Sequence, residues 1–495
     1  MSLINIVNLT FCYDGSYDNI FENVSFQIDT DWKLGFTGRN GKGKTTFLNL
    51  LLGKYEYIGN ISTNVNFEYF PYEISDKTMN TIDVINSIHI KYQLWELKRE
   101  LSLLDVSDDV LYRSFNTLSY GEQTKVLLAT LFLKENSFLL IDEPTNHLDM
   151  NARKKVSDYL KSKKGFILVS HDRMFLDNSI DHILSINKTN IEIQKGNFSS
   201  WWANKLLQDN YELNENEKLK KDIKHLGVAA ERTAEWSDKV ESTKIGFDPT
   251  KVEKSLNRRS YAGEKSRKLM KRSKAIQFRQ QNAIDEKSQL LKNIESSDSL
   301  KITQLSYHTD SFVSLDDIFI FYGDKKVCEA VSFTVERGDR IALCGKNGAG
   351  KSSILKLICG EQITYTGEFQ KGSKLRISYV SQDTSYLNGK LSDFADINNI
   401  DESLFKAILR KLDFSREQFE KCIEGFSEGQ KKKVLIAKSL CEKAHLYIWD
   451  EPLNFIDVIS RMQIEELLLQ YKPTILFVEH DSAFCNNIAT KTVML

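Results

Sequence analysis

The sequence has no apolar run long enough to cross a membrane and no cysteine pattern typical of a disulfide framework or a zinc site. A transmembrane helix needs about 18 to 20 consecutive apolar residues. The first residues, MSLINIVNLTF, also lack the cationic segment and apolar core of a signal peptide. The 7 cysteines are scattered and form no C-x-x-C pair, which favours reduced thiols. We therefore predict a cytoplasmic protein that does not have the membrane as a partner.

An excess of charge of either sign is also missing. The 67 basic residues nearly cancel the 68 acidic ones, and the formal net charge is -1 at pH 7. A nucleic-acid partner would therefore have to be bound by a local basic patch and not by the molecule as a whole. With 495 residues, of which 41% are hydrophobic, the chain is long enough for two or three domains of ordinary size.

Two phosphate-binding loops are present, and each is followed by the same set of motifs. Residues 38–45 read GRNGKGKT and residues 345–352 read GKNGAGKS, and both match G-x-x-x-x-G-K-[ST]. A serine in an LSYGE-like run, an Asp-Glu pair after an apolar run, and a histidine then follow at nearly the same spacing. These residues are Ser119, Asp142 and His171 in the first half, and Ser427, Asp450 and His480 in the second. This ordered repetition predicts a duplicated ATPase.

Both halves alternate short apolar runs with helical stretches, as in an α/β domain whose strands end in functional loops. The expected strands are residues 34–37, 138–141 and 165–169 in the first half, and 340–344, 446–449 and 474–478 in the second. We predict a first domain over residues 1–202 and a second over residues 299–495. Neither half carries a large insertion between its phosphate loop and its signature serine.

The segment between these domains, residues 203–298, is highly charged and spaces its apolar residues as helices do. Two such blocks, residues 219–230 and 269–290, flank the turn-forming cluster Gly246-Phe247-Asp248-Pro249. We predict an interdomain helical hairpin with its bend near residues 242–262. A flexible charged tether is the alternative.

The chemistry of ATP hydrolysis assigns a role to each motif. Each phosphate loop supplies backbone N–H groups, a lysine for the β- and γ-phosphates and a hydroxyl for Mg²⁺. The strand-end aspartate is expected to hold the metal, and the adjacent glutamate to polarise the attacking water. A histidine after the next strand can contact the γ-phosphate. We predict ATP and Mg²⁺ as cofactors, and the catalytic residues are Glu143, Glu451, His171 and His480.

The predicted nucleotide-binding residues lie in the phosphate loops, in the signature runs, or at an aromatic residue before each loop. Tyr13 and Tyr322 suit stacking on adenine, although an aromatic residue in a strand is more often part of the core. The full set is Tyr13, Gly38, Asn40, Gly41, Gly43, Lys44, Thr45, Thr46, Ser119, Gly121, Tyr322, Gly345, Asn347, Gly348, Gly350, Lys351, Ser352, Ser353, Ser427 and Gly429. The predicted metal ligands are Thr45, Asp142, Ser352, Gln382 and Asp450.

The signature runs, residues 118–122 (LSYGE) and 426–430 (FSEGQ), resemble those of the ATP-binding cassette family. In that family two cassettes meet head to tail, and each ATP lies between the phosphate loop of one and the signature run of the other. The resemblance implies an α/β fold with two nucleotide-binding domains of this type in tandem, joined by the long helical hairpin. It also implies that the first phosphate loop works with Ser427 and Gly429, and the second with Ser119 and Gly121.

The tandem cassettes, the charged linker and the run EPTNHLD at residues 143–149 resemble the ABC-F subfamily of ribosome-associated translation factors. Within it, residues 32–35 (WKLG), 245–247 (IGF) and 271–274 (KRSK) are similar to Lsa-type antibiotic-resistance proteins, which protect ribosomes.

The Lsa-type resemblance implies a monomer whose two cassettes pair within one chain. It also implies that the protein binds the bacterial 70S ribosome, where it would contact 23S rRNA and the P-site tRNA near the exit site. It would displace lincosamides, pleuromutilins and streptogramin A from the peptidyl-transferase region, and hydrolysis would drive its release. A housekeeping translation factor that relieves stalled ribosomes shares the same catalytic motifs. The ATPase subunit of a drug exporter and a DNA-repair ATPase explain the linker less well.

A local basic patch lies in the linker, between residues 251 and 274, where only Glu253 and Glu264 oppose a dense series of lysines and arginines. Such density fits contacts with phosphates, whereas a merely solvated helix face usually mixes both signs. Aromatic residues near the bend can stack on bases, or can equally pack the end of the hairpin. The predicted ribosome-binding residues are Phe247, Lys251, Lys254, Arg258, Arg259, Lys265, Lys268, Lys271 and Arg272.

The two halves also differ at motif positions. Gln382 stands where a cassette has its Mg²⁺-sensing glutamine, but the equivalent stretch of the first half, residues 69–72, reads YFPY. In the second half Leu453 replaces the threonine seen at Thr145, and Glu428 replaces a signature glycine. We hypothesise from these differences that the two sites hydrolyse ATP at different rates.

Overall fold

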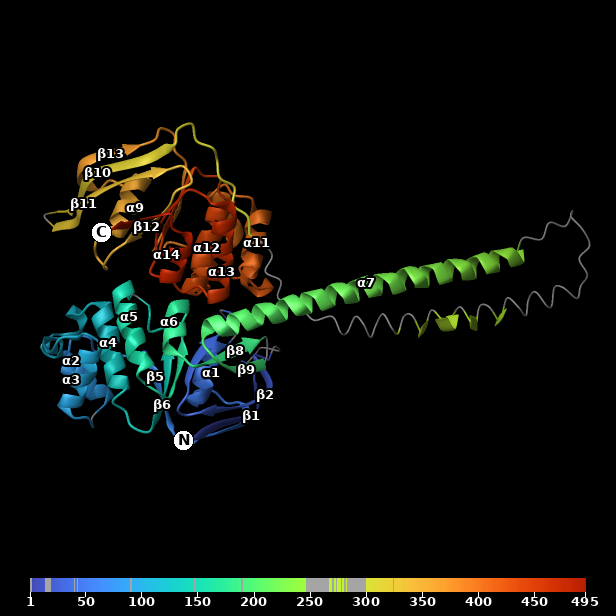
Figure 1. Ribbon diagram of the computed structural model, residues 1–495, viewed down its shortest axis with the longest axis horizontal. Helices are drawn as coiled ribbons and strands as arrows, with labels where there is room; N and C mark the ends of the chain where they lie inside the picture. Colours follow the sequence, from blue (N-terminus) through green and yellow to red (C-terminus); the bar gives the residue numbers. More distant parts are fainter. Residues whose placement is uncertain are drawn as a thin grey trace, which may run out of the picture. The chain divides into compact units, whose positions relative to one another are not determined.

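The computed structural model describes residues 2–13, 19–39, 41, 43–89, 91–146, 148–187, 190–245, 267–268, 271–272, 274–276, 278–279, 282, 300–323 and 325–495. The chain divides into two compact units (Figure 1). The first unit is made of residues 1–201 and 297–495, and the second of residues 202–296. The first unit contains both halves of the repeat, which are described below as the first half and the second half.

The first half folds around a six-stranded sheet with the strand order β5-β6-β7-β3-β8-β9. All neighbouring strands are parallel except β8 and β9. The strands are β3 (Lys33–Thr37), β5 (Asn66–Phe70), β6 (Ser137–Asp142), β7 (Phe166–Val169), β8 (His182–Asn187) and β9 (Asn190–Lys195). A smaller antiparallel sheet, in the order β2-β1-β4, consists of β1 (Leu3–Phe11), β2 (Phe21–Asp29) and β4 (Ile58–Ser62).

Helix α1 (Lys44–Leu51) packs between these two sheets, and its buried residues belong to the same core as Leu34 and Phe36 of β3. The other helices are α2 (Thr81–Ile88), α3 (Leu94–Leu103), α4 (Tyr120–Leu131), α5 (Met150–Lys161) and α6 (Arg173–Ser179), with 3-10 turns at Asp108–Tyr112 and Phe115–Thr117.

The second half repeats this plan. Its parallel sheet has the order β14-β15-β16-β12-β17, and its antiparallel sheet the order β11-β10-β13. The strands are β10 (Ser311–Tyr322), β11 (Lys325–Glu336), β12 (Arg340–Cys344), β13 (Thr364–Lys371), β14 (Ile377–Val380), β15 (Leu446–Asp450), β16 (Ile475–Val478) and β17 (Lys491–Met494). The helices are α9 (Lys351–Cys359), α10 (Leu391–Ile397), α11 (Glu402–Lys411), α12 (Glu428–Cys441), α13 (Val458–Tyr471) and α14 (Ser482–Ile488), with 3-10 turns at Arg416–Glu420 and Ile423–Gly425.

The central parallel strands β6, β7, β12, β15 and β16 are mostly apolar because both of their faces are covered. Along β12, Ile341 and Leu343 join the core that contains α9, whereas Ala342 and Cys344 join the core formed with α12, α13 and α14. Since successive side chains of a strand point to opposite faces, an uninterrupted apolar run was needed at each such strand. The predicted strands at 34–37, 138–141, 340–344 and 446–449 are confirmed.

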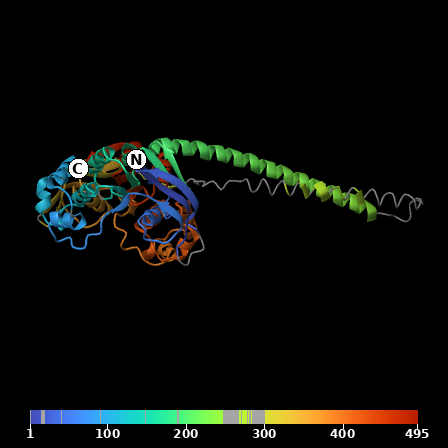
Figure 2. The same cartoon turned by 90° about the horizontal axis from the view of Figure 1, so that it is seen from below.

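Helix α7 (Phe198–Ile245) is one continuous helix and contains the first predicted block of helical spacing, residues 219–230 (Figures 1 and 2). The bend was predicted near residues 242–262, and α7 extends into this range as far as Ile245, directly before the helix-breaking Gly246. The rest of the predicted bend, residues 246–262, lies outside the described residues. Residues 267–268, 271–272, 274–276, 278–279 and 282 are helical.

Among the described residues, no helix combines the length and the apolar character that crossing a bilayer requires.

Candidate functional site

Each phosphate loop joins a central strand to a helix, β3 to α1 in the first half and β12 to α9 in the second. The residues at the helix starts, Gly43 and Gly350, have φ angles of 94° and 89°. Residues other than glycine rarely adopt this backbone conformation. A Cβ atom on Gly43 would also lie 2.5 Å from Cγ2 of Ile20. Both the backbone and the packing therefore require glycine, and the helix N–H groups stay accessible to an anion.

The two loop lysines are held in the same way. Lys44 Nζ donates to the carbonyl oxygens of Gly38 and Arg39, at 2.6 and 3.2 Å. Lys351 Nζ donates to those of Gly345 and Lys346, both at 2.9 Å. Burial lowers the pKa of both lysines. Each loop therefore carries a buried ammonium group that is fixed by the loop's own backbone.

The strand-end acids occupy equivalent positions in the two halves. Glu143 and Glu451 follow β6 and β15, and their backbones adopt left-handed φ angles of 51° and 47°. Each N–H donates to the neighbouring strand, to the carbonyl of Val169 or of Val478. Non-glycine residues in this region cost of order 1–3 kcal/mol and cluster at functional sites. The repeated conformation directs both glutamates in the same way relative to their loops.

In the second half three side chains contact the Glu451 carboxylate. Gln382 and Asn454 donate to Oε2 at 2.9 and 2.6 Å, and His480 Nε2 lies 3.3 Å from Oε1. Burial raises the pKa of Glu451, but the hydrogen bonds and charges of His480, Gln382 and Lys432 together lower it more. The net shift is downward, and this glutamate is held as a carboxylate.

In the first half, among the described residues, the contact of the Glu143 carboxyl group is with His171, where Nε2 lies 3.2 Å from Oε1. Burial, together with repulsion from Asp142, raises the pKa of Glu143 to about 8. Burial also lowers the pKa of His171 well below its usual value. At neutral pH this pair is therefore a protonated carboxyl group beside a neutral imidazole, which differs in charge from the second half.

The strand-end aspartates differ as well. Both oxygens of Asp450 are buried and lack a well-formed hydrogen bond among the described residues, and burial raises the pKa of this residue to about 6 although the nearby Ser352 hydroxyl lowers it. In the first half, Oδ2 of Asp142 accepts from Thr45 at 3.3 Å and from Tyr69 at 3.0 Å. Buried oxygens without partners beside a loop hydroxyl fit Mg²⁺, which is bound by one or two carboxylates plus substrate phosphates. The fit is better in the second half.

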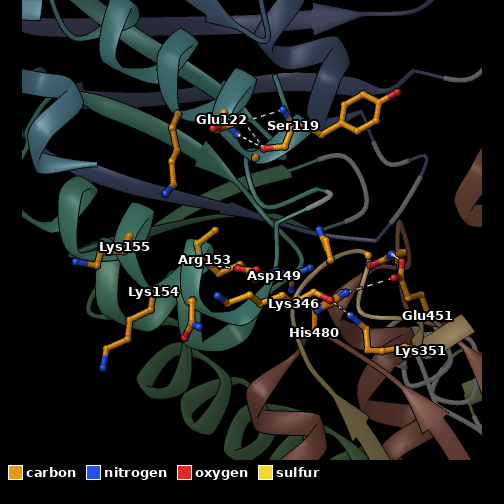
Figure 3. Close-up of a pocket in the computed structure, with 18 of the residues that line it drawn as sticks. Ser119, Glu122, Asp149, Arg153, Lys154, Lys155, Lys346, Lys351, Glu451 and His480 are labelled. Atoms are coloured by element: carbon orange, nitrogen blue, oxygen red, sulfur yellow. Dashed lines mark hydrogen bonds and ion pairs between the residues drawn. The ribbon is translucent and has the colours of Figure 1, made fainter. Parts of the chain in front are cut away.

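The two halves are brought together at a pocket of about 1330 Å³. Its walls include Lys351, Ser352, Gln382, Glu451 and His480 of the second half and, opposite them, the signature residues Ser119 and Gly121 of the first half. Figure 3 shows Ser119 hydrogen-bonded to Glu122 on one side, and Lys351, Glu451 and His480 on the other. The residues expected from the sequence to form one of the two composite sites therefore line one pocket, and nucleotide binding there stays a prediction.

The first phosphate loop also approaches the opposite half. Arg39 forms an ion pair with Asp413 at 3.1 Å. Arg461 and Asp457 of the second half are also close enough to act electrostatically on Glu143 and His171 of the first half. Ser427 caps the N-terminus of α12, and Gly429 is buried in the first turn of that helix. That Ser427 and Gly429 bind a nucleotide together with the first phosphate loop stays a prediction.

The histidine loops depend on two arginines that motif reasoning missed. Arg153 donates to the Leu148 carbonyl at 3.0 Å and to Asp172 at 3.0 Å. Arg461 makes the same two contacts, with Ile456 at 2.9 Å and Asp481 at 3.4 Å. Each aspartate follows the predicted catalytic histidine and caps the next helix. The repeat in the sequence could have identified these two arginines, because an arginine stands at the same position in both halves.

The departure at Leu453 is compensated by Glu479, which stands directly before His480 where the first half has Ser170 before His171. In the first half the hydroxyls of Thr145 and Ser170 are hydrogen-bonded at 3.2 Å. In the second half Leu453 has no hydroxyl, and the buried Glu479 carboxylate accepts the Leu453 backbone N–H at 2.7 Å. Both arrangements join the strand-end loop to the histidine loop.

The other departure, Glu428, lies in the first turn of α12 and accepts hydrogen bonds from the side chains of Thr384 and Lys431.

The aromatic residues before the loops contact the loop hydroxyls. The hydroxyl of Tyr13 lies 2.7 Å from Oγ1 of Thr46, and Tyr322 donates to Oγ of Ser353 at 3.3 Å. Both residues are exposed, and the Tyr13 ring also contacts those of Phe11 and Tyr55. Adenine stacking stays a prediction.

Several predicted site residues cannot be placed. Asn40 and the linker residues Phe247, Lys251, Lys254, Arg258, Arg259 and Lys265 lie outside the described residues. Lys268, Lys271 and Arg272 are described, helical and exposed. Among the residues that the structure describes, no cluster of three or more histidines, cysteines and acids offers a further metal site.

Comparison with known proteins identifies both halves. A family model described as ABC transporter matches residues 21–146 and 328–454. Each matched stretch contains one phosphate loop, which confirms the predicted tandem cassettes.

Similar sequences span nearly the whole chain. The ATP-binding protein Uup of Buchnera aphidicola is 27% identical, over 99% of this chain and 80% of the relative. The ribosome protection protein VmlR of Bacillus subtilis is also 27% identical, over 99% of this chain and 86% of the relative.

Among solved structures, the archaeal ribosome recycling factor aABCE1, in complex with stalk protein aP1, aligns with a TM-score of 0.62. RNase-L Inhibitor aligns with 0.61. Both are 18% identical and cover 98% of this chain and 87% of their own. At this identity the likeness shows the fold alone.

Proposed function

Since this chain belongs to the ABC transporter family, with two ATP-binding cassettes in tandem as in the ABC-F subfamily, we propose that it is a ribosome-protecting ATPase. In this proposal it binds the bacterial ribosome with ATP between its cassettes and displaces drugs from the peptidyl-transferase region. ATP hydrolysis then drives its release. The cassettes themselves imply ATPase activity.

The observation that carries the proposal is the pocket between the second phosphate loop and the signature run of the first cassette. A nucleotide bound there touches both cassettes, so its binding energy favours the closed arrangement. Ser119 lies at the N-terminus of α4, where backbone N–H groups and the helix dipole favour an anion. Closure of the cassettes is thus coupled to the phosphates of ATP.

Within the second site Glu451 is the residue that polarises water. Its carboxylate is ionised and oriented by Gln382, Asn454 and His480. Lys351 and Ser352 bind phosphate and metal, and Asp450 holds the metal. When bound, Mg²⁺ supplies charge neutralisation at the β- and γ-phosphates. The first site is the slower one in this proposal, because Glu143 is protonated at neutral pH and Asp142 is already hydrogen-bonded to Tyr69.

Two features support a ribosomal target. The sequence is similar along 99% of its length to a protein named as a ribosome protection protein. The linker between the cassettes contains the long helix α7. After the predicted bend it contains the exposed residues Lys268, Lys271 and Arg272. Such residues contact RNA phosphates, and their binding weakens as salt rises.

The drug classes in the proposal are lincosamides, pleuromutilins and streptogramin A, which the Lsa-type resemblance implies. The mechanism is displacement: the linker would be directed at the peptidyl-transferase region, shift tRNA or rRNA, and so lower the affinity of the site for drug.

The experiment is cell-free bacterial translation with a panel of drugs, comparing the protein with its Glu143→Gln/Glu451→Gln double variant. We expect rescue by the wild type and inhibition by the variant, which stays bound. Replacement of residues 246–250 by a Gly/Ser turn serves as the linker control, which should keep ATPase activity and lose protection. Rescue of stalled translation without drug would favour a housekeeping factor, and binding to membranes in place of ribosomes would favour an exporter subunit.

A further inference from the structure

The ion pair between Arg39 and Asp413 joins a phosphate loop to the opposite cassette. Its atoms lie 3.1 Å apart, and the side chains are only 12% and 28% exposed. Arg39 is the second residue of the first phosphate loop, and its backbone carbonyl accepts a hydrogen bond from Lys44 Nζ. A force on Arg39 is therefore transmitted to the lysine that binds phosphate.

The backbone conformation at Asp413 indicates that its carboxylate has a role that outweighs the backbone strain. It follows α11 with a φ angle of 70°, and its N–H and that of Phe414 donate to Arg410 and Leu409. This is the helix-ending motif in which glycine is preferred, because a side chain is strained there. The structure has an acid where glycine would stabilise the backbone.

The repeat has the same acid in the first cassette. Asp105 follows α3 with a φ angle of 57°, and Asp105 and Val106 donate to Ser102 and Leu101 in the same pattern. The position of Arg39 is taken by Lys346 in the second phosphate loop, and the Lys346 carbonyl likewise accepts from Lys351 Nζ. The molecule thus contains the components of two equivalent pairs.

Only one of the two pairs is formed. Asp105 and Lys346 both line the pocket between the cassettes, but among the described residues no ion pair joins them. Asp105 instead lies 3.7 Å from Lys155 of its own cassette, with both side chains more than half exposed. The second cassette has the neutral Gln463 at the place of Lys155. Asp413 therefore has no equivalent competing cation.

We propose that Asp413 and Asp105 are positioning residues that anchor the opposite phosphate loop through its second residue, Arg39 or Lys346, when nucleotide closes the cassettes. The first pair is already formed in this structure. The second forms on closure, when Asp105 exchanges Lys155 for Lys346. This inference rests on the proposed function, because it requires closure around ATP.

Asp105→Gly and Asp413→Gly test the proposal, because glycine relieves the left-handed backbone while removing the charge. Loss of one partly exposed ion pair should raise KM for ATP about two- to fivefold. The value of kcat should change little, since the pair holds the closed state and takes no part in the chemistry. The thermal midpoint should stay equal or rise, which separates positioning from structural damage.

Charge exchange gives the decisive comparison. Asp105→Lys with Lys346→Asp, and Asp413→Arg with Arg39→Asp, should restore KM relative to each single reversal. Lys155→Gln should lower KM, because it removes the competing partner of Asp105. Unchanged KM in both glycine variants, or no rescue by either exchange, overturns the proposal.

A wild-type protein that neither binds nor hydrolyses ATP would instead overturn the proposed function, so the two failures are distinguishable.

Discussion

Gln382 donates a hydrogen bond of 2.9 Å to Glu451, and the first cassette has no equivalent of this amide. The strand register shows why. Tyr69 of β5 pairs with Leu140, as Tyr379 of β14 pairs with Ile448. Counting forward from these two tyrosines places Tyr72 at the position of Gln382, and a phenol cannot supply an amide. The two glutamates therefore differ in partners although their backbones match.

We expect Glu451→Gln to remove most of the ATPase activity and Glu143→Gln to leave most of it. Loss of a general base lowers the rate at its own site by about 10²- to 10⁴-fold. The total rate then falls to the share of the other site, and Glu451 is the ionised, oriented glutamate. Steady-state phosphate release by the two single variants measures the effect. Indistinguishable losses would contradict the inequality of the sites.

The raised pKa of Glu143 predicts a specific pH dependence. This carboxyl is neutral below about pH 8 and gains its charge as pH rises through that value. In the Glu451→Gln variant, where only the first site is intact, activity should therefore rise about tenfold between pH 7 and pH 9. The Glu143→Gln variant should be flat over this range, because the pKa of Glu451 is lowered. Parallel pH profiles of the two variants would be evidence against this charge assignment.

Sequence reasoning was strongest where a motif imposes local geometry. The phosphate loops, strand-end acids and flanking strands follow from glycine positions and from apolar runs that only a strand covered on both faces requires. It was weaker for contacts that depend on tertiary distance. The Asp142–Tyr69 hydrogen bond joins neighbouring strands, and the Arg39–Asp413 ion pair joins two halves. No spacing rule in the sequence brings these residues together.

The compensating pair at Leu453 and Glu479 can be tested by exchange. Glu479→Ser removes the acceptor of the buried Leu453 N–H and should lower the free energy of unfolding by about 1 to 3 kcal/mol. Adding Leu453→Thr recreates the hydroxyl pair of the first cassette, Thr145 with Ser170, and should recover most of the loss. Urea unfolding followed by circular dichroism measures both. Additive losses in the double variant would show that the two positions are independent.

An ion pair whose side chains are 14% and 9% exposed also joins the cassettes, between residues that do not line the pocket. Arg173, the first residue of α6, donates to Glu465 of α13, and Asn487 of α14 donates to the other carboxylate oxygen at 2.6 Å. This ion pair is not repeated between the equivalent helices, because Ser482 stands at the position of Arg173 and Ser157 at the position of Glu465. Glu465 thus connects the helices that follow the two predicted catalytic histidines.

We expect Glu465→Ala to lower the free energy of unfolding by about 3 to 5 kcal/mol, since it leaves the Arg173 charge buried without its partner. Glu466→Ala, at the exposed neighbouring position of the same helix, is the matched control and should change stability by less than about 0.5 kcal/mol. Replacing both partners by methionine should recover most of the loss, because no unpaired charge remains. If the double variant is as unstable as Glu465→Ala, packing volume and not charge pairing holds this interface.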